Sequence, residues 1–466
     1  MVALFVLVVL GVLGLLGAVH RYVWKRLVRD TTAPGPRGRR LRRIGAAAAV
    51  VLPLLSLGAV TSGRLGAPFW LQQVLAWPGF LWLAVLLYLT LALFVGEAVR
   101  PLLLRRRRAA PGAAAVVVAA EPGSGPGAST SPSPSPSPSP SPRPVLVSGG
   151  DGSDGGDGGV GSDGGVETAE GGGGGAAAVR VSGPVGDRPV PAVSRRLFVS
   201  RIVGATATAA ALGTVAYGAH NVLSGPRLQR VTVPLARLPR SAHGFRIAVV
   251  SDIHLGPILG RAHTQRIVDT INAAQPDLIA VVGDLVDGSV ADLGRAAEPL
   301  AGLRSPHGTF FVTGNHEYYA GAAPWLAHIR ELGLHPLENA RVEIPGFDLA
   351  GVNDVGGEAF GHGPDFAAAL GDRDRSRASV LLAHQPVQIH EAVRHGVGLQ
   401  LSGHTHGGQL WPGNLIAGLA NPTVAGLERY GDTQLYVSRG AGAWGPPVRV
   451  GAPSDITLVQ LASRNA

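Results

Sequence analysis

Eight residues of types that bind metals or transfer protons follow apolar runs of the chain almost immediately. Runs such as FRIAVV, DLIAVV and GTFFVT are typical of buried strands, and polar loops come directly after them. Because parallel strands end at a common edge of a sheet, we expect the side chains of these loops to meet. The residues are Asp252, His254, Asp284, Asn315, His316, His384, His404 and His406.

This set of residue types predicts a site for two metal ions. Two divalent cations about 3.5–4 Å apart need a shared ligand, and a carboxylate at Asp284 can give one oxygen to both. Asp252 and His254 are two residues apart, as are His404 and His406, so each pair can reach one metal from extended backbone. The chain has no cysteine, which excludes disulfides, thiolate metal sites and Cys nucleophiles. Imidazole and carboxylate together suit Zn, Fe, Mn or Co.

Five motifs, DIH, GDLVD, GNHE, AHQP and GHTH, occur in an order that resembles the calcineurin-like metallophosphoesterase superfamily, over about residues 225–462. The resemblance implies an α/β fold, a four-layer α/β/β/α sandwich, with two divalent metal ions, Mn, Fe or Zn. It assigns Asp252, His254 and His406 to one metal. It assigns Asn315, His384 and His404 to the other, with Asp284 as the bridge. His316 is then a residue that binds no metal, contacts the phosphate and helps the leaving group depart.

Within that superfamily, the chain is most similar to bacterial membrane-associated phosphoesterases, which are often exported by the twin-arginine route. GHTHGGQ and the ending VSRGAGAWGPPVRVGAPSDITLVQL carry this similarity. The chain departs from it at 454–457, where Ser-Asp-Ile-Thr replaces an expected Pro-Glu-Ile-Thr. Two further residues of the motifs have two interpretations each. Asp287 either orients a ligating histidine or caps the following helix, and Glu317 either supports the site or forms a salt bridge.

The first 104 residues predict a membrane region. Charge-free apolar runs at about 2–19, 44–60 and 79–96 are long enough to cross a bilayer as helices. The net charge of +9 is concentrated here, because residues 1–110 contain 15 Lys and Arg but two acids. Positive charge beside apolar runs favours membrane topology over nucleic-acid binding, so no nucleic-acid partner is expected.

The positions of the basic residues also predict an orientation. The segment between the first two runs carries nine Lys and Arg, and RRRR follows the third run, whereas the loop between the second and third has only Arg64. The positive-inside rule places the basic segments in the cytoplasm. With a fourth crossing at 194–223, the C-terminal domain at 225–462 is expected outside the cytoplasm, on a multi-pass membrane protein.

Two segments separate the membrane region from that domain. Residues 105–193, with SPSPSPSPSPSP and a Gly/Asp-rich stretch, predict a disordered linker. Residues 194–223 open with SRRLFV and continue as an apolar stretch, so they are either a twin-arginine-like export signal or a fourth transmembrane helix. The export machinery is a partner under the first interpretation.

The sequence therefore predicts a membrane-anchored, metal-dependent phosphoesterase that acts on a phosphodiester or phosphomonoester. Membrane lipids and a phosphorylated small-molecule or lipid substrate are the expected partners, and an envelope or lipid-linked substrate is favoured. Two alternatives remain. One is a pyrophosphatase acting on a nucleotide-linked diacylglucosamine-type lipid precursor. The other is a non-catalytic membrane scaffold or receptor, which should have lost a metal ligand or His316; neither is missing.

Overall fold

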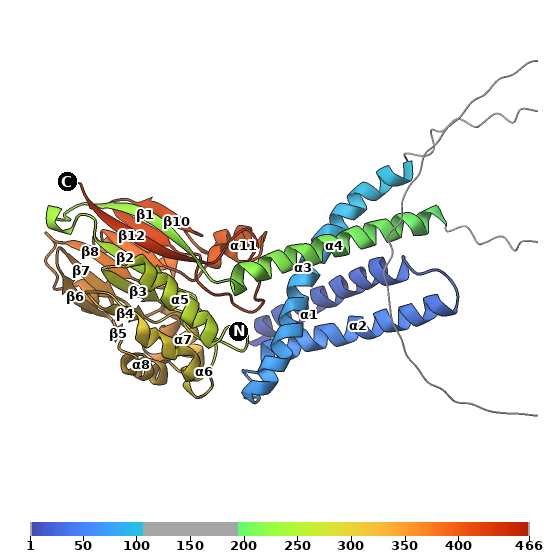
Figure 1. Ribbon diagram of the computed structural model, residues 1–466, viewed down its shortest axis with the longest axis horizontal. Helices are drawn as coiled ribbons and strands as arrows, with labels where there is room; N and C mark the ends of the chain where they lie inside the picture. The colour runs from blue at the N-terminus through green and yellow to red at the C-terminus, as the bar shows by residue number, and fades with distance from the viewer. Residues whose placement is uncertain (1, 106–193, 465–466) are drawn as a thin grey trace, which may run out of the picture. The chain divides into compact units, whose positions relative to one another are not determined.

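The computed structural model describes residues 2–105 and 194–464, which belong to one compact unit. The predicted linker at 105–193 lies outside the described residues, apart from Arg105 at the end of a helix. The N-terminal part consists of the long helices of Figure 1. They are α1 (Val2–Trp24), which continues into the π-helical turn Lys25–Arg29, and α2 (Pro36–Thr61), α3 (Phe69–Arg105) and α4 (Arg195–Leu223).

Three helices among the described residues are long and apolar enough to cross a membrane: Pro36–Thr61, Phe69–Leu104 and Arg195–Leu223. The predicted runs at 44–60 and 79–96 lie inside α2 and α3, and the run at 2–19 lies inside α1. The predicted run begins directly after Pro78, whereas helix α3 begins at Phe69 and contains Pro78 in its interior. Apolar helices that pack against neighbours tolerate the amide hydrogen bond that a proline removes.

Helices α2 and α3 form a close pair joined by the short segment 62–68. Ser56 Oγ donates a hydrogen bond of 2.8 Å to the carbonyl of Gly79 across the pair. A Cβ atom at Gly79 would lie 2.5 Å from the Leu55 carbonyl oxygen, so only glycine permits this approach. Small residues at such crossings let helix backbones pack closely in a membrane.

The arginine-rich ends of the helices lie together. Arg195 donates to the Leu103 carbonyl at 3.0 Å, and Arg201 donates to the Thr31 carbonyl at 3.0 Å. At its other end α4 contacts the C-terminal domain, where the Asn221 side chain donates to the Arg449 carbonyl at 3.4 Å. The helix ends that carry the basic residues are therefore opposite to the ends that contact the domain.

The C-terminal domain contains two six-stranded sheets. The first has the order β1-β12-β2-β3-β4-β5, in which β2 to β5 are parallel and β12 runs antiparallel to β2. Its strands are β1 (Arg227–Leu235), β12 (Asp455–Ser463), β2 (Arg246–Val250), β3 (Leu278–Val282), β4 (Thr309–Val312) and β5 (His335–Pro336).

The second sheet has the order β10-β11-β9-β8-β7-β6. Its four central strands are parallel, and a hairpin partner runs antiparallel at each edge. Its strands are β10 (Gly426–Tyr430), β11 (Thr433–Val437), β9 (Leu399–Ser402), β8 (Ala378–Leu382), β7 (Phe347–Gly351) and β6 (Ala340–Ile344).

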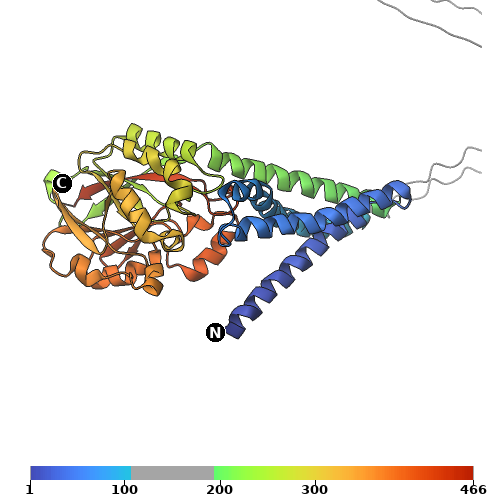
Figure 2. The same ribbon diagram turned by 90° about the horizontal axis from the view of Figure 1, so that it is seen from below.

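The sheets pack face to face, and helices cover both outer faces, which confirms the predicted α/β/β/α sandwich. Apolar side chains of both sheets, among them Val249, Phe347 and Leu401, form the central core. The helices α5 (Arg261–Ala274), α6 (Val290–Ala297) and α8 (Ala322–Glu331) pack on the first sheet. The short helices α9 (Phe366–Leu370) and α10 (Ile389–Arg394) pack on the second. Figure 2 shows the yellow-green and the orange helices on opposite sides of the sheets.

Every apolar run that predicted a strand forms one, and the missed strands lie mostly at sheet edges. The edge strand β1 has only exposed or half-buried positions over Arg227–Val231 and contains Pro234, so it carries no apolar run of the kind that predicted the other strands. It is a strand because it pairs in parallel with β12 along its whole length. Edge strands depend on such tertiary pairing more than central strands do.

Candidate metal centre

Five loops at the carboxyl ends of β2, β3, β4, β8 and β9 carry all eight predicted site residues. Five of these residues have a left-handed backbone, with φ of 52° at Asp252, 48° at His254, 53° at Asp284, 71° at His404 and 53° at His406. Each such conformation costs about 1–3 kcal/mol for a residue other than glycine. The fold tolerates this backbone strain at the residues whose side chains it directs toward one site.

The first set of predicted ligands converges within hydrogen-bonding range. Nε2 of His254 lies 3.0 Å from Nε2 of His406, and the latter atom lies 3.3 Å from Oδ1 of Asp252. These three residues form one of the groups whose ligand atoms could hold a metal ion. They come from the loops after β2 and β9, which belong to different sheets.

The second set lies beside the first and shares one carboxylate with it. Oδ2 of Asp284 is 3.2 Å from Nε2 of His384 and 3.7 Å from Nε2 of His254. Asp284, His384 and His404 form another group with metal-ligand spacing. Nδ1 of His404 lies 3.1 Å from Oδ1 of Asn315, which places the neutral oxygen ligand at this set. Asp284 thus lies between the two sets, and its role as a bridging ligand stays a prediction.

A buried histidine nitrogen indicates that a cation fits here. Nδ1 of His384 donates to the Val282 carbonyl at 2.9 Å, whereas its fully buried Nε2 makes no well-formed hydrogen bond among the described residues and only approaches the carboxylate of Asp284, at 3.2 Å. Leaving a buried polar atom unpaired is costly, and coordination to a metal would satisfy it. The donors around it are imidazole nitrogens, carboxylates and one amide oxygen, which suit two divalent transition metals.

The electrostatics of the site separate the histidines into two kinds. Burial lowers the pKa of His254, but the neighbouring carboxylate of Asp287, helped by Asp284 and Asp252, raises it to about 9. Burial and the cationic neighbours His254 and Arg449 hold the pKa of His406 well below its usual range. His406 is therefore neutral at physiological pH, whereas His254 would have to lose a proton in order to bind a metal.

Asp287 orients two histidines, which settles its two interpretations. Its Oδ1 lies 2.8 Å from Nδ1 of His254 and 2.8 Å from Nδ1 of His316. The helix α6 is instead capped by Ser289, whose hydroxyl accepts from the amide of Asp292. Burial by itself would raise the pKa of Asp287. The two histidines outweigh this effect and lower the pKa to about 2, so the carboxylate is ionised. With Nδ1 bonded to Asp287, His254 presents Nε2 to the ligand cluster.

His316 lies at the rim of the cluster, at the start of α7 (Asn315–Ala320). Its backbone amide donates to Oδ1 of Asp284 at 3.0 Å, and its ring is 5.8 Å from the ring of Trp444. Its side chain is 16% exposed, whereas that of His254 is fully buried. The group formed by His254, Asp287 and His316 is explained by the shared hydrogen bonds to Asp287. The role of His316 as a residue that does not bind metal stays a prediction.

Glu317 supports the site through backbone hydrogen bonds, and it forms no salt bridge with any residue that the structure describes. Its fully buried carboxylate accepts from the amides of Asp284 at 3.0 Å, Leu285 at 2.8 Å and Gly314 at 2.6 Å. These bonds join the loop after β3 to the loop after β4. Burial and the nearby Asp284 raise the pKa of Glu317 to about 7.

Glu317→Ala should destabilise the protein, because three buried amides would lose their acceptor. Each unsatisfied buried group costs about 1–3 kcal/mol, so we expect a loss on the order of 3 kcal/mol and a clearly lower Tm. Thermal unfolding of the purified chain would measure it. Glu317→Gln, which keeps one acceptor oxygen, is the matched control and should lose less. Equal Tm values for wild type and Glu317→Ala would contradict this role.

Arg449 was not predicted from the sequence, although it lies directly behind a ligand. It is fully buried, and it donates to the carbonyls of His406 at 3.1 Å and Gly442 at 2.6 Å. One of its nitrogens lies 3.0 Å from Nδ1 of His406. The sequence signal that could have indicated Arg449 is its position between two valines, in VRV. A charged residue in such an apolar segment is buried only where hydrogen-bond acceptors surround it.

Comparisons with known proteins agree with this geometry. A family model described as calcineurin-like phosphoesterase matches residues 245–408. An uncharacterized metallophosphoesterase of Aquifex aeolicus is 35% identical over 243 residues, which cover 51% of this chain and 92% of that protein. The chain belongs to the calcineurin-like phosphoesterase family. The matched segment contains all eight predicted site residues.

Two further relatives are matched over a smaller share of their own length. A transmembrane protein with metallophosphoesterase domain of Danio rerio is 39% identical over 259 residues, which are 53% of this chain and 59% of that protein. An uncharacterized metallophosphoesterase of Helicobacter pylori is 38% identical over 259 residues, 55% of this chain and 69% of that protein. The chain thus spans about 59% of the length of the first of these relatives.

Proposed function

We propose that this protein is a membrane-anchored, metal-dependent phosphoesterase that hydrolyses a phosphodiester or phosphomonoester. The convergence of six ligand side chains around a seventh, the shared carboxylate of Asp284, carries the proposal. A scaffold or receptor that only binds a ligand would not need Asp284 between two complete ligand sets. The alternative of a pyrophosphatase acting on a nucleotide-linked lipid precursor uses the same centre.

The residues divide the chemical work between them. Two divalent cations bound here would supply Lewis-acid stabilisation of the phosphoryl oxygens and a water molecule of lowered pKa as the nucleophile. Asp252, His254 and His406 would hold one cation, and Asn315, His384 and His404 the other, with Asp284 between them. Because Nδ1 of His316 is bonded to Asp287, its Nε2 is left to donate a proton to the leaving oxygen. The phosphorus–oxygen bond to the leaving group then breaks.

Hydrolysis of bis(p-nitrophenyl) phosphate by the purified full-length chain tests this proposal. Activity should appear with Mn, Zn or Fe and disappear when a chelator removes the metal. His335→Ala is a suitable control, because His335 is exposed on β5, outside the site, and should leave the rate unchanged. A fully metal-loaded protein that hydrolyses no phosphoester would favour the scaffold.

The C-terminal domain should face the outside of the cell. Three long apolar helices support membrane association, and the domain contacts the helix ends opposite to the arginine-rich ones. By the positive-inside rule, the arginine-rich ends are cytoplasmic. Helix α4 packs against neighbouring helices, which favours a retained helix over a cleaved signal. Arg195 and Arg196 are exposed at its start, where the twin-arginine machinery could recognise them.

An alkaline-phosphatase reporter fused after Val222 should be active, because that enzyme works outside the cytoplasm. A reporter that is active in the cytoplasm alone should be silent at the same position. Fusions after Arg43, in the basic segment, provide the opposite control. The reverse pattern would overturn the orientation and would make a cytoplasmic nucleotide-linked substrate the better proposal.

A further inference from the structure

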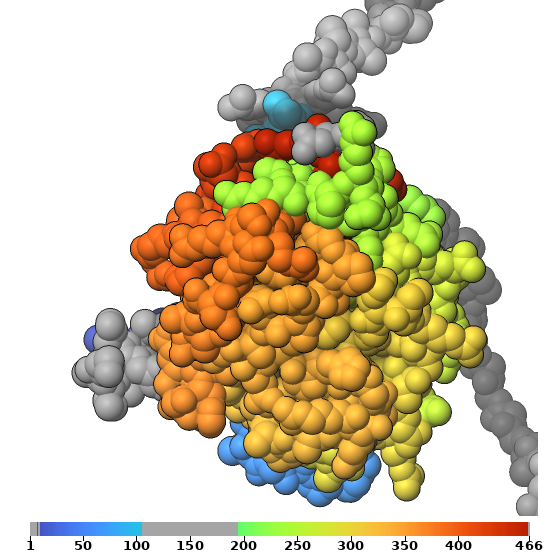
Figure 3. Space-filling model, turned by 90° about the vertical axis from the view of Figure 1, so that its left-hand side faces the viewer, coloured from blue at the N-terminus to red at the C-terminus, as the bar shows by residue number. Residues whose placement is uncertain are grey.

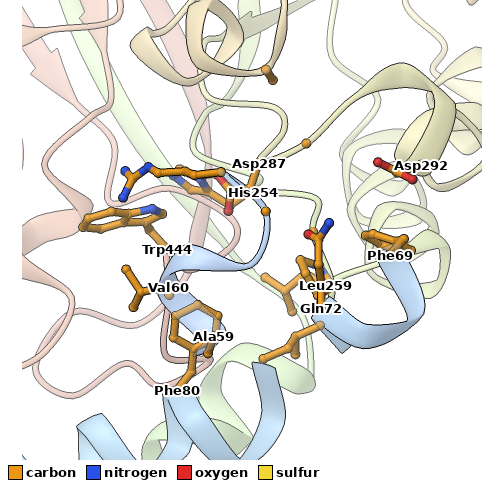
Figure 4. Close-up of a pocket in the computed structure, with 18 of the residues that line it drawn as sticks. Ala59, Val60, Phe69, Gln72, Phe80, His254, Leu259, Asp287, Asp292 and Trp444 are labelled. Carbon is orange, nitrogen blue, oxygen red and sulfur yellow. Dashed lines mark hydrogen bonds and ion pairs between the residues drawn. The ribbon is translucent and has the colours of Figure 1, made fainter. Parts of the chain in front are cut away.

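A cavity of about 610 Å³ connects the metal centre to the membrane helices. Cavities of this size hold a ligand of several hundred daltons. One wall comes from the end of α2, the connecting segment and the start of α3 (Figure 4). The opposite wall comes from loops of the metallophosphoesterase domain. Figure 3 shows atoms of the light-blue α2–α3 region at the lower edge of that domain.

The lining is polar next to the ligand cluster and mixed on the helix side, where Arg64 and Gln72 lie among apolar residues. His254, Asp287 and His316 form the polar side, next to the ligand cluster. Figure 4 shows Val60 and Phe80 on the helices and Trp444 between them and His254. The apolar lining residues include Ala59, Val60, Phe69, Phe80, Ile258, Leu259 and Trp444.

The helix residues of this lining lie at the expected edge of the bilayer. Trp70 and Trp77 on α3 are 64% and 41% exposed, and tryptophans collect at the headgroup level. Val60 is 44% exposed, although it belongs to an apolar helix long enough to cross a membrane. The apolar side of the cavity is therefore formed where α2 and α3 leave the lipid.

A helix of the domain indicates the same boundary. Helix α11 (Gly413–Ala420) follows the ligand loop and has no buried residue. Its Leu415, Ile416 and Leu419 are 66%, 72% and 88% exposed. Leu410, just before it, packs with the cluster formed by α3 and α4. A bilayer surface would cover such an apolar helix next to the membrane helices.

We propose that this cavity binds the apolar chain of a membrane-borne phosphoester while its phosphate lies at the metal centre. The inference rests on the proposed hydrolysis and adds the substrate class and the residues that select it. A lipid of this kind would enter from the bilayer edge of α2 and α3. A water-soluble phosphoester would gain nothing from Val60 and Phe80.

The test uses three p-nitrophenyl phosphodiesters whose second group is methyl, hexyl or hexadecyl. Hydrolysis adds water oxygen to phosphorus, breaks the bond to nitrophenolate and releases that coloured product in all three cases. The full-length chain, loaded with metal in lipid nanodiscs, is compared with Val60→Trp, which fills the apolar side. Val51→Trp is the matched control, because Val51 lies on the same helix, is 51% exposed and does not line the cavity.

For the wild type, kcat/KM should rise from the methyl to the hexadecyl ester. Val60→Trp should lower the ratio of hexadecyl to methyl kcat/KM by about tenfold or more, a typical discrimination for an apolar pocket. Val51→Trp should keep the wild-type ratio. Because the ratios are compared between variants in the same lipid, differences among the esters in partition into the lipid cancel. Phe80→Ala, which removes apolar contact without adding bulk, should lower the ratio too.

The possible failures are distinguishable. If the metal-loaded wild type hydrolyses none of the esters, the proposed function and this inference fall together. If it hydrolyses all three with equal kcat/KM, the inference alone is overturned and the phosphoesterase function stands. A ratio that Val60→Trp leaves unchanged, or that Val51→Trp lowers equally, also overturns the inference.

Discussion

Asp284→Ala should yield a protein that binds fewer than two metal ions and has lost nearly all hydrolytic activity. Oδ2 of Asp284 lies 3.2 Å from Nε2 of His384 and 3.7 Å from Nε2 of His254, so one carboxylate serves both ligand sets. A bound cation contributes several kcal/mol of transition-state stabilisation, so a decrease on the order of 10³-fold or more is expected.

Metal analysis and rates on the same preparation would measure both effects. Asp432→Ala is the control, because the side chain of Asp432 is fully exposed in the β10–β11 hairpin. That variant should keep two metals and the wild-type rate. An Asp284→Ala protein that still binds two metal ions would show that another residue bridges them.

His316→Ala should retain two metal ions and lose turnover by roughly 10²–10⁴-fold, the range for a general acid. The ring lies outside both ligand sets, and its Nδ1 is bonded to Asp287 at 2.8 Å. The loss should be smallest for nitrophenyl esters, because nitrophenolate leaves without a proton. It should be largest for alkyl esters, whose leaving alkoxide needs one.

Rates on activated and unactivated esters, with metal analysis of each sample, would decide the role of His316. His335→Ala again supplies a histidine variant outside the site. Loss of metal in His316→Ala would make His316 a ligand. Full activity on unactivated esters would leave it without a catalytic role.

The sequence predicted the ligand cluster because the pattern that specifies each ligand is local in the sequence. Each ligand follows the end of a buried strand by two to four positions, and a parallel sheet brings such strand ends to one edge. The same reasoning predicted the central strands, which are fully buried and strongly apolar, as in LIAVV of β3. It missed β1, whose strand conformation comes from its pairing with β12.

Residues that hydrogen-bond to the predicted ligands could be proposed from the sequence, but their roles could not be decided from it. Asp287 was an equal candidate for a helix cap and for orienting a histidine, since both use the same carboxylate. The structure places its Oδ1 at 2.8 Å from two imidazoles. Arg449 is 43 residues away from His406 and belongs to none of the five ligand motifs, so its contact with His406 depended on the fold.

The sequence by itself determined the residue types of a dinuclear site, the apolar helices and the asymmetry of basic charge. These properties belong to single segments and follow from composition and spacing. Tertiary structure alone decided that Val60 and Phe80 share a cavity with His254 and Trp444. Those residues are separated by the linker and by most of the metallophosphoesterase domain. Cavities form where segments distant in the sequence pack without filling space, and no local pattern records that arrangement.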